Sequence, residues 1–410
     1  MVRNKLIRLR KELEIELKGN ILSFWIDHTV DRENGGFYGY VSNDLAKHDK
    51  SDKAFILNIR ILWTFSKAFH IFKDQQYLEM AKRAYDYILN HFWDKEFGGV
   101  YWLLDYKGEV KVSKKQTYAQ AFAIYGLTEY YRATGIQESL IKAKQLYELM
   151  EQHCYDPQYG GYTEAYSADW KALDDRSLSE KDMNVAKSMN TNLHVMEAYT
   201  NLLSVWNNDI LKSKLRDLVN DTMEHIVDRQ TYHFRLYFDE DWTSKSDIIS
   251  FGHDIEGSWL LYEAAEQLCD ALFCKKVKDI ALMMAQKVYQ QGIDFKQGGV
   301  FNEVDHNNIL HAEKVWWPQA EAVVGFFNAY QLSSEVRYLQ VALDTWDYIK
   351  NNIIDEKQGE WFWDARYANG QYQDEEKAGP WKCPYHNSRM CFEIIARINK
   401  MILVNPQFGS

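Results

Sequence analysis

Two kinds of hydrophobic pattern alternate along this chain. Residues 54–72 are apolar at nearly every position, which is typical of a helix surrounded by other helices. Residues 77–92 carry apolar side chains at helical spacing and a charged opposite face, which is typical of a helix at the surface. We therefore expect helical pairs, each made of one inner and one outer helix.

A short motif separates the helical pairs: an aspartate, three further residues and two glycines (Asp-x-x-x-Gly-Gly). Its copies are 61 to 72 residues apart; the fourth has lost both glycines and the sixth has lost one. A period kept over most of a chain indicates one repeated structural unit. The copies begin at Asp31, Asp94, Asp156, Asp228, Asp294 and Asp355.

Helix, helix and short β-turn, six times over, predict an all-α fold. We expect an (α/α)6 barrel with six inner and six outer helices and short β-hairpins in the connecting loops. Because each repeat depends on its neighbours for burial, we expect a single catalytic barrel domain over residues 1–410. The Gly-Gly pairs should form tight hairpins in which glycine supplies a positive φ.

The composition supports this fold and argues against several kinds of partner. Only 5 prolines in 410 residues suit a mainly helical chain. The 14 Trp and 27 Tyr suit both core packing and stacking on sugar rings. A net charge of −11 without a long basic run makes nucleic acid an unexpected partner. No uncharged stretch of about 18 apolar residues predicts a membrane span.

The N-terminus and the cysteines indicate the compartment. Residues 1–20 have a charged amphipathic pattern without the apolar centre of a signal peptide. The five cysteines form neither a Cys-x-x-Cys pair nor a framework spacing. We therefore expect reduced thiols in a cytoplasmic protein, present as a monomer or a weak homodimer.

Polar and aromatic residues cluster where each inner helix should begin. Pro318 and Pro384 fit the first position of the fifth and sixth inner helices, where a missing N–H costs nothing. Ser250 fits the cap of the fourth. The clusters contain Asn58 and Arg60; Tyr118, Gln120 and Phe122; Asn190, Asn192, His194 and Glu197; His253, Asp254 and Glu256; Trp316, Trp317, Gln319 and Glu321; and Trp381, His386, Asn387 and Arg389.

His194, His253 and His386 recur at equivalent points of three repeats. A lone histidine on an apolar helix is more often a hydrogen-bonded core residue than a catalyst, but the recurrence weakens that interpretation. Arg60 is costly to bury without a polar partner. The sequence leaves two interpretations of Arg60 open: an ion pair with Glu256 or Glu321, or contact with a ligand. For Tyr118 and Phe122, core packing and contact with substrate are equally open interpretations.

Histidines at helix N-termini favour proton-transfer chemistry. The positive end of the helix dipole disfavours imidazolium, lowers the histidine pKa and stabilises a developing negative oxygen. A neutral imidazole near pH 7 acts as a general base. Two bases around one carbon suit proton removal and return beside a carbonyl, as at C2 of an open-chain aldose. Return to the opposite face inverts C2, and protonation of C1 gives the ketose.

Three other interpretations use the same residues. Three histidines and a carboxylate could bind zinc, although no His-Glu-x-x-His spacing is present and helix N-termini repel a cation. Asp182, Glu256 or Glu321 could be the paired carboxylates of a glycoside hydrolase, which leaves the histidines without a role. A non-catalytic sugar-binding or scaffold protein would use the aromatic residues but does not require clustered histidines.

Four segments resemble the N-acylglucosamine 2-epimerase superfamily, and within it the cellobiose 2-epimerases. They read NTNLHVMEAY, SFGHDIEGSWLL, WWPQAEAVVGF and PWKCPYHNSRMCFE, in the family's order. The resemblance covers nearly the whole chain, and GHDIE together with PYHNSR is highly specific. It implies an (α/α)6 barrel that uses no metal and no other cofactor.

The resemblance also implies an activity on a small-molecule disaccharide. This is C2 epimerisation of the reducing-end glucose of β-1,4-linked disaccharides, from cellobiose to glucosyl-mannose and from lactose to epilactose. Relatives that act on mannose or on N-acylglucosamine keep similar histidines. A 2-epimerase or an aldose–ketose isomerase for those monosaccharides therefore remains the alternative.

By motif match, the resemblance assigns roles to individual residues. His253 and His386 correspond to the acid/base pair, with the order of proton transfer left open, and His194 would lie near O1 and O2 of the reacting sugar. Arg60 would stabilise the anionic intermediate, and Glu256 would orient a histidine. The candidates for substrate contact are Tyr118, Asp182, Asn190, Trp316, Trp317, Glu321 and Trp381.

The third repeat carries a long polar insert, residues 168–188, before its inner helix. It lengthens the separation between Asp156 and His194 to 38 residues, against 25 between Asp228 and His253. We hypothesise that the insert is a lid that covers the site and contacts the non-reducing sugar. A solvated surface loop is the alternative.

Overall fold

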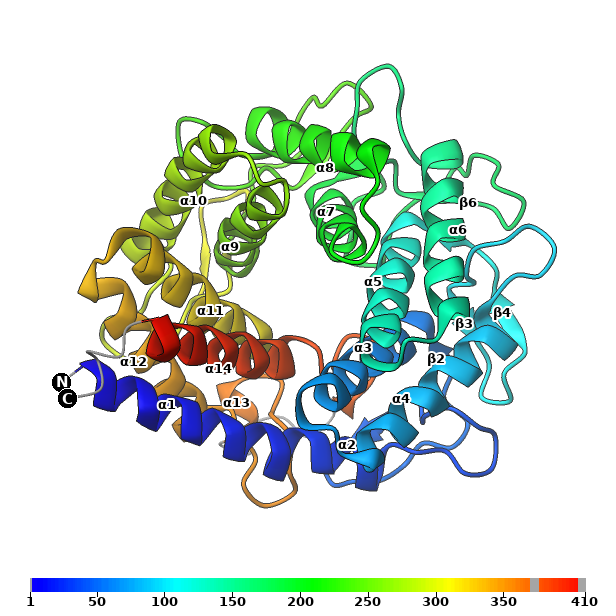
Figure 1. The fold of residues 1–410 in the computed structure, drawn as a ribbon, viewed down its shortest axis with the longest axis horizontal. Coiled ribbons are helices and arrows are strands. Elements are labelled where there is room, and N and C mark those ends of the chain that lie inside the picture. Colours follow the sequence, from blue (N-terminus) through cyan, green and yellow to red (C-terminus); the bar gives the residue numbers. More distant parts are fainter. Residues whose placement is uncertain (1, 369–375, 405–410) are drawn as a thin grey trace.

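The inner helices form a closed ring (Figure 1). The computed structural model describes residues 2–368 and 376–404. Each inner helix packs against the next, and the last packs against the first. The inner helices are α3 (Phe55–Phe72), α5 (Thr117–Thr134), α7 (Met189–Leu203), α9 (Phe251–Gln267), α11 (Trp316–Ser333) and α14 (His386–Val404).

A second ring of helices surrounds the first; each outer helix packs mainly on one inner helix, and α8 and α10 also contact a second one. Three outer helices contain a π-helical turn, labelled η. The predicted (α/α)6 barrel is confirmed. The outer helices are α1 (Val2–Glu16) with η1 (Leu17–Leu22) and α2 (Ser23–His28), α4 (Gln75–Tyr87) with η2 (Ile88–Phe92), α6 (Gln137–His153), α8 (Asp209–Asp221) with η3 (Thr222–Ile226), α10 (Ala271–Gln291) and α12 (Val336–Asn352).

Short antiparallel strands join consecutive repeats. The strand before an inner helix pairs with the strand that follows the next motif, and β1 pairs with β12 across the seam between the first and last repeats. A short helix, α13 (Ala365–Ala368), lies in the last connection. The sheets are β1 (Val41–Ser42) with β12 (Glu376–Ala378); β2 (Lys53–Ala54), β3 (Leu103–Leu104) and β4 (Val110–Val112); β5 (Lys115–Gln116) with β6 (Ala165–Tyr166); β7 (Lys187–Ser188) with β8 (Tyr237–Phe238); and β9 (Ile249–Ser250), β10 (Glu303–Val304) and β11 (Leu310–His311).

Each Asp-x-x-x-Gly-Gly motif is a loop closed by one β-bridge. The bridge joins the residue before the aspartate to the residue after the second glycine, as between Trp93 and Val100. Six residues lie inside the bridge, so each expected hairpin has a longer loop than a two-residue turn. The expected positive φ is confirmed: Gly98 and Gly99 have φ of 72° and 77°. Where the glycines are lost, Tyr232 and Glu360 still adopt φ of 60° and 61°.

In five repeats a buried ion pair fastens the motif to the segment that leads into an inner helix, whereas in the fourth Asp228 pairs with Arg235 seven positions on, and both side chains are partly exposed. In the second repeat Lys115 Nζ lies 2.7 Å from Asp94 Oδ2, and both side chains are fully buried or nearly so. The other oxygen of Asp94 accepts the backbone N–H groups two and three residues further on. The corresponding pairs are Lys53–Asp31, Lys187–Asp156, Lys314–Asp294 and Lys377–Asp355.

The fourth residue of four inner helices holds the same loops from the other side. Gln120 Oε1 accepts the N–H of Val100 at 2.8 Å, and Gln319 Oε1 accepts the N–H of Val300 at 2.8 Å. Asn192 and Asp254 make the equivalent bonds. These polar residues at the helix starts thus serve the connections between repeats.

The two prolines at helix starts are one or more residues away from the expected first position. Pro318 is the third residue of α11, and Pro384 lies two residues before α14. A proline at the third position is tolerated because the first four N–H groups of a helix have no intrahelical acceptor. His386 does lie in the first turn of α14, as expected.

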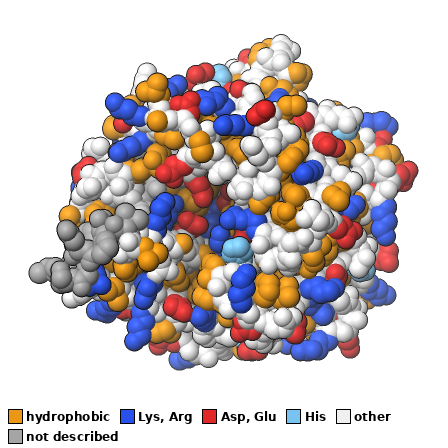
Figure 2. Space-filling model, in the orientation of Figure 1, with side chains coloured by type: hydrophobic (Ala, Val, Ile, Leu, Met, Phe, Trp, Pro, Cys, Tyr) orange, Lys and Arg blue, Asp and Glu red, His pale blue; other side chains and the backbone are white. Residues whose placement is uncertain are grey.

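The surface carries both signs of charge. On the face drawn in Figure 2, lysine and arginine side chains are interspersed with aspartate and glutamate, and the surface is hollowed near the centre. Across the described ranges, no helix combines the length and the apolar character needed to cross a bilayer.

Candidate active site

A cavity of about 510 Å³ opens at the N-terminal ends of the inner helices, and all six of them contribute to its wall. This volume is within the range typical of small-molecule sites. The wall is formed by Arg60, Tyr118, Leu178, Ser179, Glu180, Lys181, Asp182, Asn190, His194, His253, Glu256, Trp316, Trp317, Trp363, Trp381 and His386.

The cavity brings together the residues expected at the site, with one exception. Glu321 does not line the wall, because its carboxylate lies behind His386 and is bonded to other side chains. Its Oε2 accepts the indole N–H of Trp259 at 3.1 Å. Glu321 is therefore placed to support His386, whereas the sequence suggested contact with substrate. Trp363 lines the cavity although no sequence signal pointed to it.

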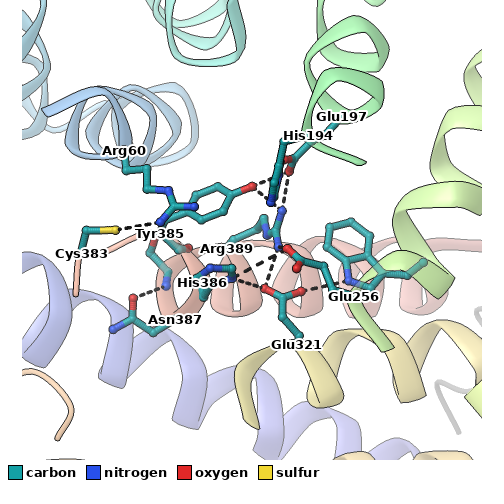
Figure 3. A network of polar contacts seen from close by, with 12 residues as sticks. Arg60, His194, Glu197, Glu256, Glu321, Cys383, Tyr385, His386, Asn387 and Arg389 are labelled. Carbon is teal, nitrogen blue, oxygen red and sulfur yellow. Dashed lines mark hydrogen bonds and ion pairs between the residues drawn. The ribbon is translucent and has the colours of Figure 1, made fainter. Parts of the chain in front are cut away.

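Arg389 is the centre of a buried carboxylate network (Figure 3). Its Nη2 donates to Glu321 Oε1 at 2.6 Å and also to Glu256, and its Nη1 donates to Glu197. The Arg389 side chain is 1% exposed. Because charged groups are buried only when they are paired, the guanidinium and the three carboxylates depend on one another.

His194 is held by one of these carboxylates. Its Nδ1 lies 2.8 Å from Glu197 Oε2, and its ring contacts Tyr118 edge-on with centroids 5.1 Å apart. Burial acts to raise the pKa of Glu197, but Arg389 and His194 outweigh it and lower that pKa to about 2. A charged carboxylate fixes Nδ1 as the protonated nitrogen, which leaves Nε2 as the lone-pair nitrogen for the cavity.

His386 has the same kind of support. Its Nδ1 lies 2.7 Å from Glu321 Oε1 and 3.9 Å from Glu256 Oε1. Burial lowers the pKa of His386 well below its usual value, against the opposing effect of Glu256. The ring packs against Trp317, with centroids 5.4 Å apart. Burial therefore favours the neutral imidazole form of His386.

His253 is supported by a hydroxyl group. Its Nδ1 lies 2.7 Å from Ser250 Oγ, and its ring lies 4.7 Å from that of Trp317. Ser250 occupies the expected cap position, but its hydroxyl bonds to His253 and does not cap the backbone. Burial lowers the pKa of His253. The predicted direction is confirmed for His253 and His386, while the largest cause is burial, where the sequence suggested the helix dipole.

Arg60 carries a positive charge that no carboxylate contacts among the described residues. Its Nη2 donates to Tyr118 Oη at 2.7 Å, and its Nη1 lies 3.6 Å from Cys383 Sγ. The guanidinium also packs on the ring of Tyr385, 4.8 Å from the centroid. The expected alternative of an ion pair with Glu256 or Glu321 is wrong, because Arg389 takes both. Arg60 is left free to attract an anion in the cavity.

Within the described part of the chain, one group of side chains has metal-ligand atoms close together, but it does not suit a cation. Oxygen or nitrogen atoms of Glu256, Glu321 and His386 lie within 4.8 Å of one another. The guanidinium of Arg389 already bonds to both carboxylates. A metal ion would have to share those oxygens with a buried positive charge and would be repelled by it.

The insert of the third repeat forms one side of the cavity. Residues 178–182 line it, which a fully solvated loop would not do. The loop is tied down by hydrogen bonds of 2.8 Å from Lys114 Nζ and Gln116 Nε2 to the carbonyl oxygen of Ser177. Tyr237 Oη donates to Asp182 Oδ1 at 2.9 Å.

Comparison with known proteins identifies the family. The family model described as N-acylglucosamine 2-epimerase (GlcNAc 2-epimerase) matches residues 36–389. The chain belongs to this family. A cellobiose 2-epimerase from Bacteroides fragilis is 43% identical over 94% of this chain and 98% of its own length.

Solved structures support the same N-acylglucosamine 2-epimerase family. The structure of cellobiose 2-epimerase from Bacillus thermoamylovorans superposes with a TM-score of 0.90 at 39% identity, covering 95% of this chain and 99% of its own. A structure of D-mannose isomerase superposes with a TM-score of 0.80 at 21% identity, covering 94% and 97%. At that identity, the second likeness shows the shared fold alone.

The sequence analysis of this epimerase family member did not assign two side chains that bond to candidate site residues. Glu197 and Arg389 were noted at helix starts but were not assigned to the site. Each lies three residues after a site histidine, on the same helix face. The spacing that linked His253 to Glu256 would also have linked His194 to Glu197 and His386 to Arg389. Tyr385, which donates to Glu197 Oε1 at 2.5 Å, gave no comparable signal.

Proposed function

We propose that this epimerase inverts C2 of the reducing-end glucose of β-1,4-linked disaccharides, converting cellobiose to glucosyl-mannose and lactose to epilactose. The observation that carries the proposal is the pair of imidazoles with lowered pKa values, His253 and His386, which both pack against Trp317 in one cavity. The 43% identity to a cellobiose 2-epimerase over nearly the whole chain supports the choice of substrate.

The reaction needs a base on each face of C2. After the sugar ring opens, one of His253 and His386 takes the C2 proton through Nε2, and the C2–H electron pair forms the C1–C2 double bond. The carbonyl π electrons move to O1, which gives the enediolate. The other histidine takes up a proton from water at the cavity mouth and transfers it to the opposite face of C2, and the carbonyl re-forms; the first histidine then releases its proton to water. General acid–base catalysis of this kind works best with groups that change protonation state near the working pH.

The negative charge of the enediolate calls for a preorganised cation. Arg60 is buried at the cavity wall, and its charge is not neutralised by a carboxylate within the described residues. A fixed positive group in a partly dry site stabilises developing charge without reorganisation. We propose that Arg60 and His194 contact the reacting oxygens O1 and O2, with Tyr118 holding Arg60 in place.

The remaining wall suits the two sugar rings. Trp316, Trp317, Trp363 and Trp381 offer aromatic faces, which pack on the C–H faces of sugars. Asn190 and Asp182 offer hydrogen bonds to hydroxyl groups. Because Asp182 lies on the insert, we propose that the insert contacts the non-reducing sugar and favours a disaccharide over mannose or N-acylglucosamine.

The glycoside hydrolase alternative fits the carboxylates poorly. A hydrolase needs an acid and a base or nucleophile facing the scissile bond. Glu256 and Glu321 are instead bonded to Arg389.

We also propose a cytoplasmic enzyme, which the five unpaired cysteines support.

Deuterium exchange tests the proposal. The protein is incubated with cellobiose in D2O, and the products are separated and examined by NMR. We expect glucosyl-mannose to form and deuterium to appear at C2 of both disaccharides. Epimerisation without exchange would contradict the enediolate route, and release of glucose would favour hydrolysis. Parallel incubations with lactose, mannose and N-acetylglucosamine define the substrate, and His253→Ala and His386→Ala should be inactive but folded.

A further inference from the structure

The sixth repeat has a buried glutamate where other repeats have a glycine. Glu360 stands at the second glycine position of its motif, with φ of 61° and a fully buried side chain. A non-glycine residue with positive φ carries a conformational cost. A carboxylate without solvent contact must also be paired. Both features indicate that this side chain makes interactions that offset these costs.

Glu360 has four hydrogen-bond donors around its carboxylate. Oε1 accepts from Asn387 Nδ2 at 2.7 Å and from Trp25 Nε1 at 3.1 Å. Oε2 accepts from Lys382 Nζ at 2.5 Å and from the backbone N–H of Trp361. The Lys382 side chain is fully buried as well. Two of the four donors belong to one short stretch of chain: Lys382 precedes α14, and Asn387 is in its first turn.

The other repeats solve the same connection differently. A Cβ at Gly299 would lie 2.7 Å from Gln319 Oε1, so the second glycine lets the amide of the inner helix approach the bridge directly. In the sixth repeat the carboxylate of Glu360 accepts the equivalent bridge N–H, from Trp361, and reaches on to Asn387. The side chain thus inserts a link between the bridge and the inner helix.

The segment held by this link carries much of the candidate site. In the first four repeats a strand runs directly into the inner helix, and in the fifth four residues separate them, whereas residues 379–385 run to α14 without regular structure. Within the segment, Cys383 contacts Arg60 and Tyr385 donates to Glu197. His386 follows immediately and bonds to Glu321.

We propose that Glu360 is a positioning residue for His386: through Lys382 and Asn387 it fixes the segment 382–387 so that the imidazole stays aligned between Glu321 and the cavity. This inference rests on the proposed role of His386 in proton transfer. Without the carboxylate, the ammonium group of Lys382 is buried and unpaired, and the segment shifts to hydrate it. Even small displacements of an acid/base group are costly for catalysis.

The neighbouring ion pair of the same repeat supplies a matched control. Lys377 Nζ lies 2.6 Å from Asp355 Oδ2, with side chains 0% and 7% exposed. The two residues are 22 positions apart, as are Lys382 and Glu360. This pair holds β12, which precedes the segment, and it makes no bond to residues 382–387 among the described contacts. Asp355→Asn therefore removes a comparable buried charge without releasing the segment.

The first measurement compares kcat for cellobiose epimerisation in Glu360→Gln and Asp355→Asn, with thermal unfolding measured for both. We expect a similar loss of Tm in the two variants, a fall in kcat of at least tenfold for Glu360→Gln with little change in KM, and kcat within about twofold of wild type for Asp355→Asn. Equal kcat values in the two variants would overturn the proposal. Asn387→Ala cuts the link from the helix side and should reproduce the kcat loss if Glu360→Gln does not fold.

A second measurement does not depend on turnover. The pKa of His386 is followed by NMR of histidine labelled at Cε1, with the signal assigned from its loss in His386→Gln. Because burial holds this pKa low, we expect loosening of the segment to raise it in Glu360→Gln and Asn387→Ala but not in Asp355→Asn. An unchanged pKa would refute the positioning role. If the wild type does not epimerise cellobiose, the proposed function fails, and the pKa comparison still decides whether Glu360 fixes His386.

Discussion

At the scale of single residues, the three site histidines differ in what holds their Nδ1 atoms. His194 and His386 face carboxylates, Glu197 and Glu321, whereas His253 faces the hydroxyl of Ser250. A carboxylate stabilises the imidazolium form and fixes the tautomer. A hydroxyl can donate or accept and does neither as strongly. The two proposed proton-transfer groups are thus not equivalent, although they face the same ring of Trp317.

The lowered pKa values of His253 and His386 predict the pH dependence of the reaction. A general base works when it is deprotonated, so activity is lost as the pH falls through the folded-state pKa. Because burial moves both pKa values below 6.5, the acid limb of kcat/KM for cellobiose should lie below pH 6.5. The profile is measured with far-UV circular dichroism at each pH as a control for unfolding. A midpoint above 6.5 would contradict the assignment.

Removal of Arg389 should destabilise the fold strongly. Arg389→Met leaves Glu197, Glu256 and Glu321 buried without their cation, and breaking such a network costs about 3–5 kcal/mol. Lys82→Met on α4 is the control, since both Lys82 and its partner Asp86 are exposed and such surface pairs contribute about 1 kcal/mol or less. Urea unfolding measures both. A loss for Arg389→Met no larger than that of the control would show that the network contributes little.

The positions of site residues were more predictable from the sequence than their partners. The repeat places Arg60, His194, His253 and His386 at helix starts, and helices in a ring bring such starts together. The pairing of Arg389 with three carboxylates depends on contacts between α7, α9, α11 and α14, which no local pattern encodes. For the same reason the sequence left Glu256 and Glu321 open as ion-pair partners of Arg60, whereas in the structure both bond to Arg389.

At the scale of elements, the connections between helices are more elaborate than their sequence indicated. The motif predicted a turn, and its glycines do adopt a positive φ. The lysine that pairs with the motif aspartate lies about 20 to 30 residues away, on the segment that leads into the inner helix. The pairing of this lysine with the aspartate cannot be predicted from spacing alone, because isolated lysines are common at surfaces. In the fourth repeat the aspartate pairs instead with Arg235, seven positions on and partly exposed.

The insert supplies a prediction at this scale. Replacing Leu178–Asp182 with glycine and serine residues of equal number keeps the loop length but removes the wall that these side chains form. We expect kcat/KM for cellobiose to fall about tenfold or more, while that for a monosaccharide substrate is little changed. The comparison uses both substrates with one protein preparation. An equal effect on both substrates would show that the insert does not select for the second sugar.

At the scale of the whole molecule, the barrel closes where the first and sixth repeats meet. The first outer helix packs on the last inner helix, and β1 pairs with β12. Glu16 and Asn20 line this seam: Glu16 Oε1 accepts from Trp361 Nε1 at 2.8 Å, and Asn20 Oδ1 accepts from the N–H of Glu360 at 2.8 Å. The ring is thus completed by contacts between residues more than 300 positions apart.

Glu16 makes the seam sensitive to pH. Burial raises its pKa from 4.5 to about 7, so the folded state binds the proton more tightly than the unfolded state does. Its contribution to stability is full below pH 4.5 and is lost as the pH rises through about 7. Wild type should therefore lose Tm relative to Glu16→Gln between pH 5 and 8. Parallel Tm curves for the two proteins would contradict this.

The seam also sets the order in which a new chain can finish folding. Leu6, Leu9 and Leu13 of α1 are buried against a ring whose last member, α14, is synthesised last. At about 5–20 residues per second, roughly 20 to 80 s separate the emergence of the two helices from the ribosome. During that time the apolar face of α1 has no native partner on α14. Because His386 begins α14, the nascent chain has no complete site until its final helix is released.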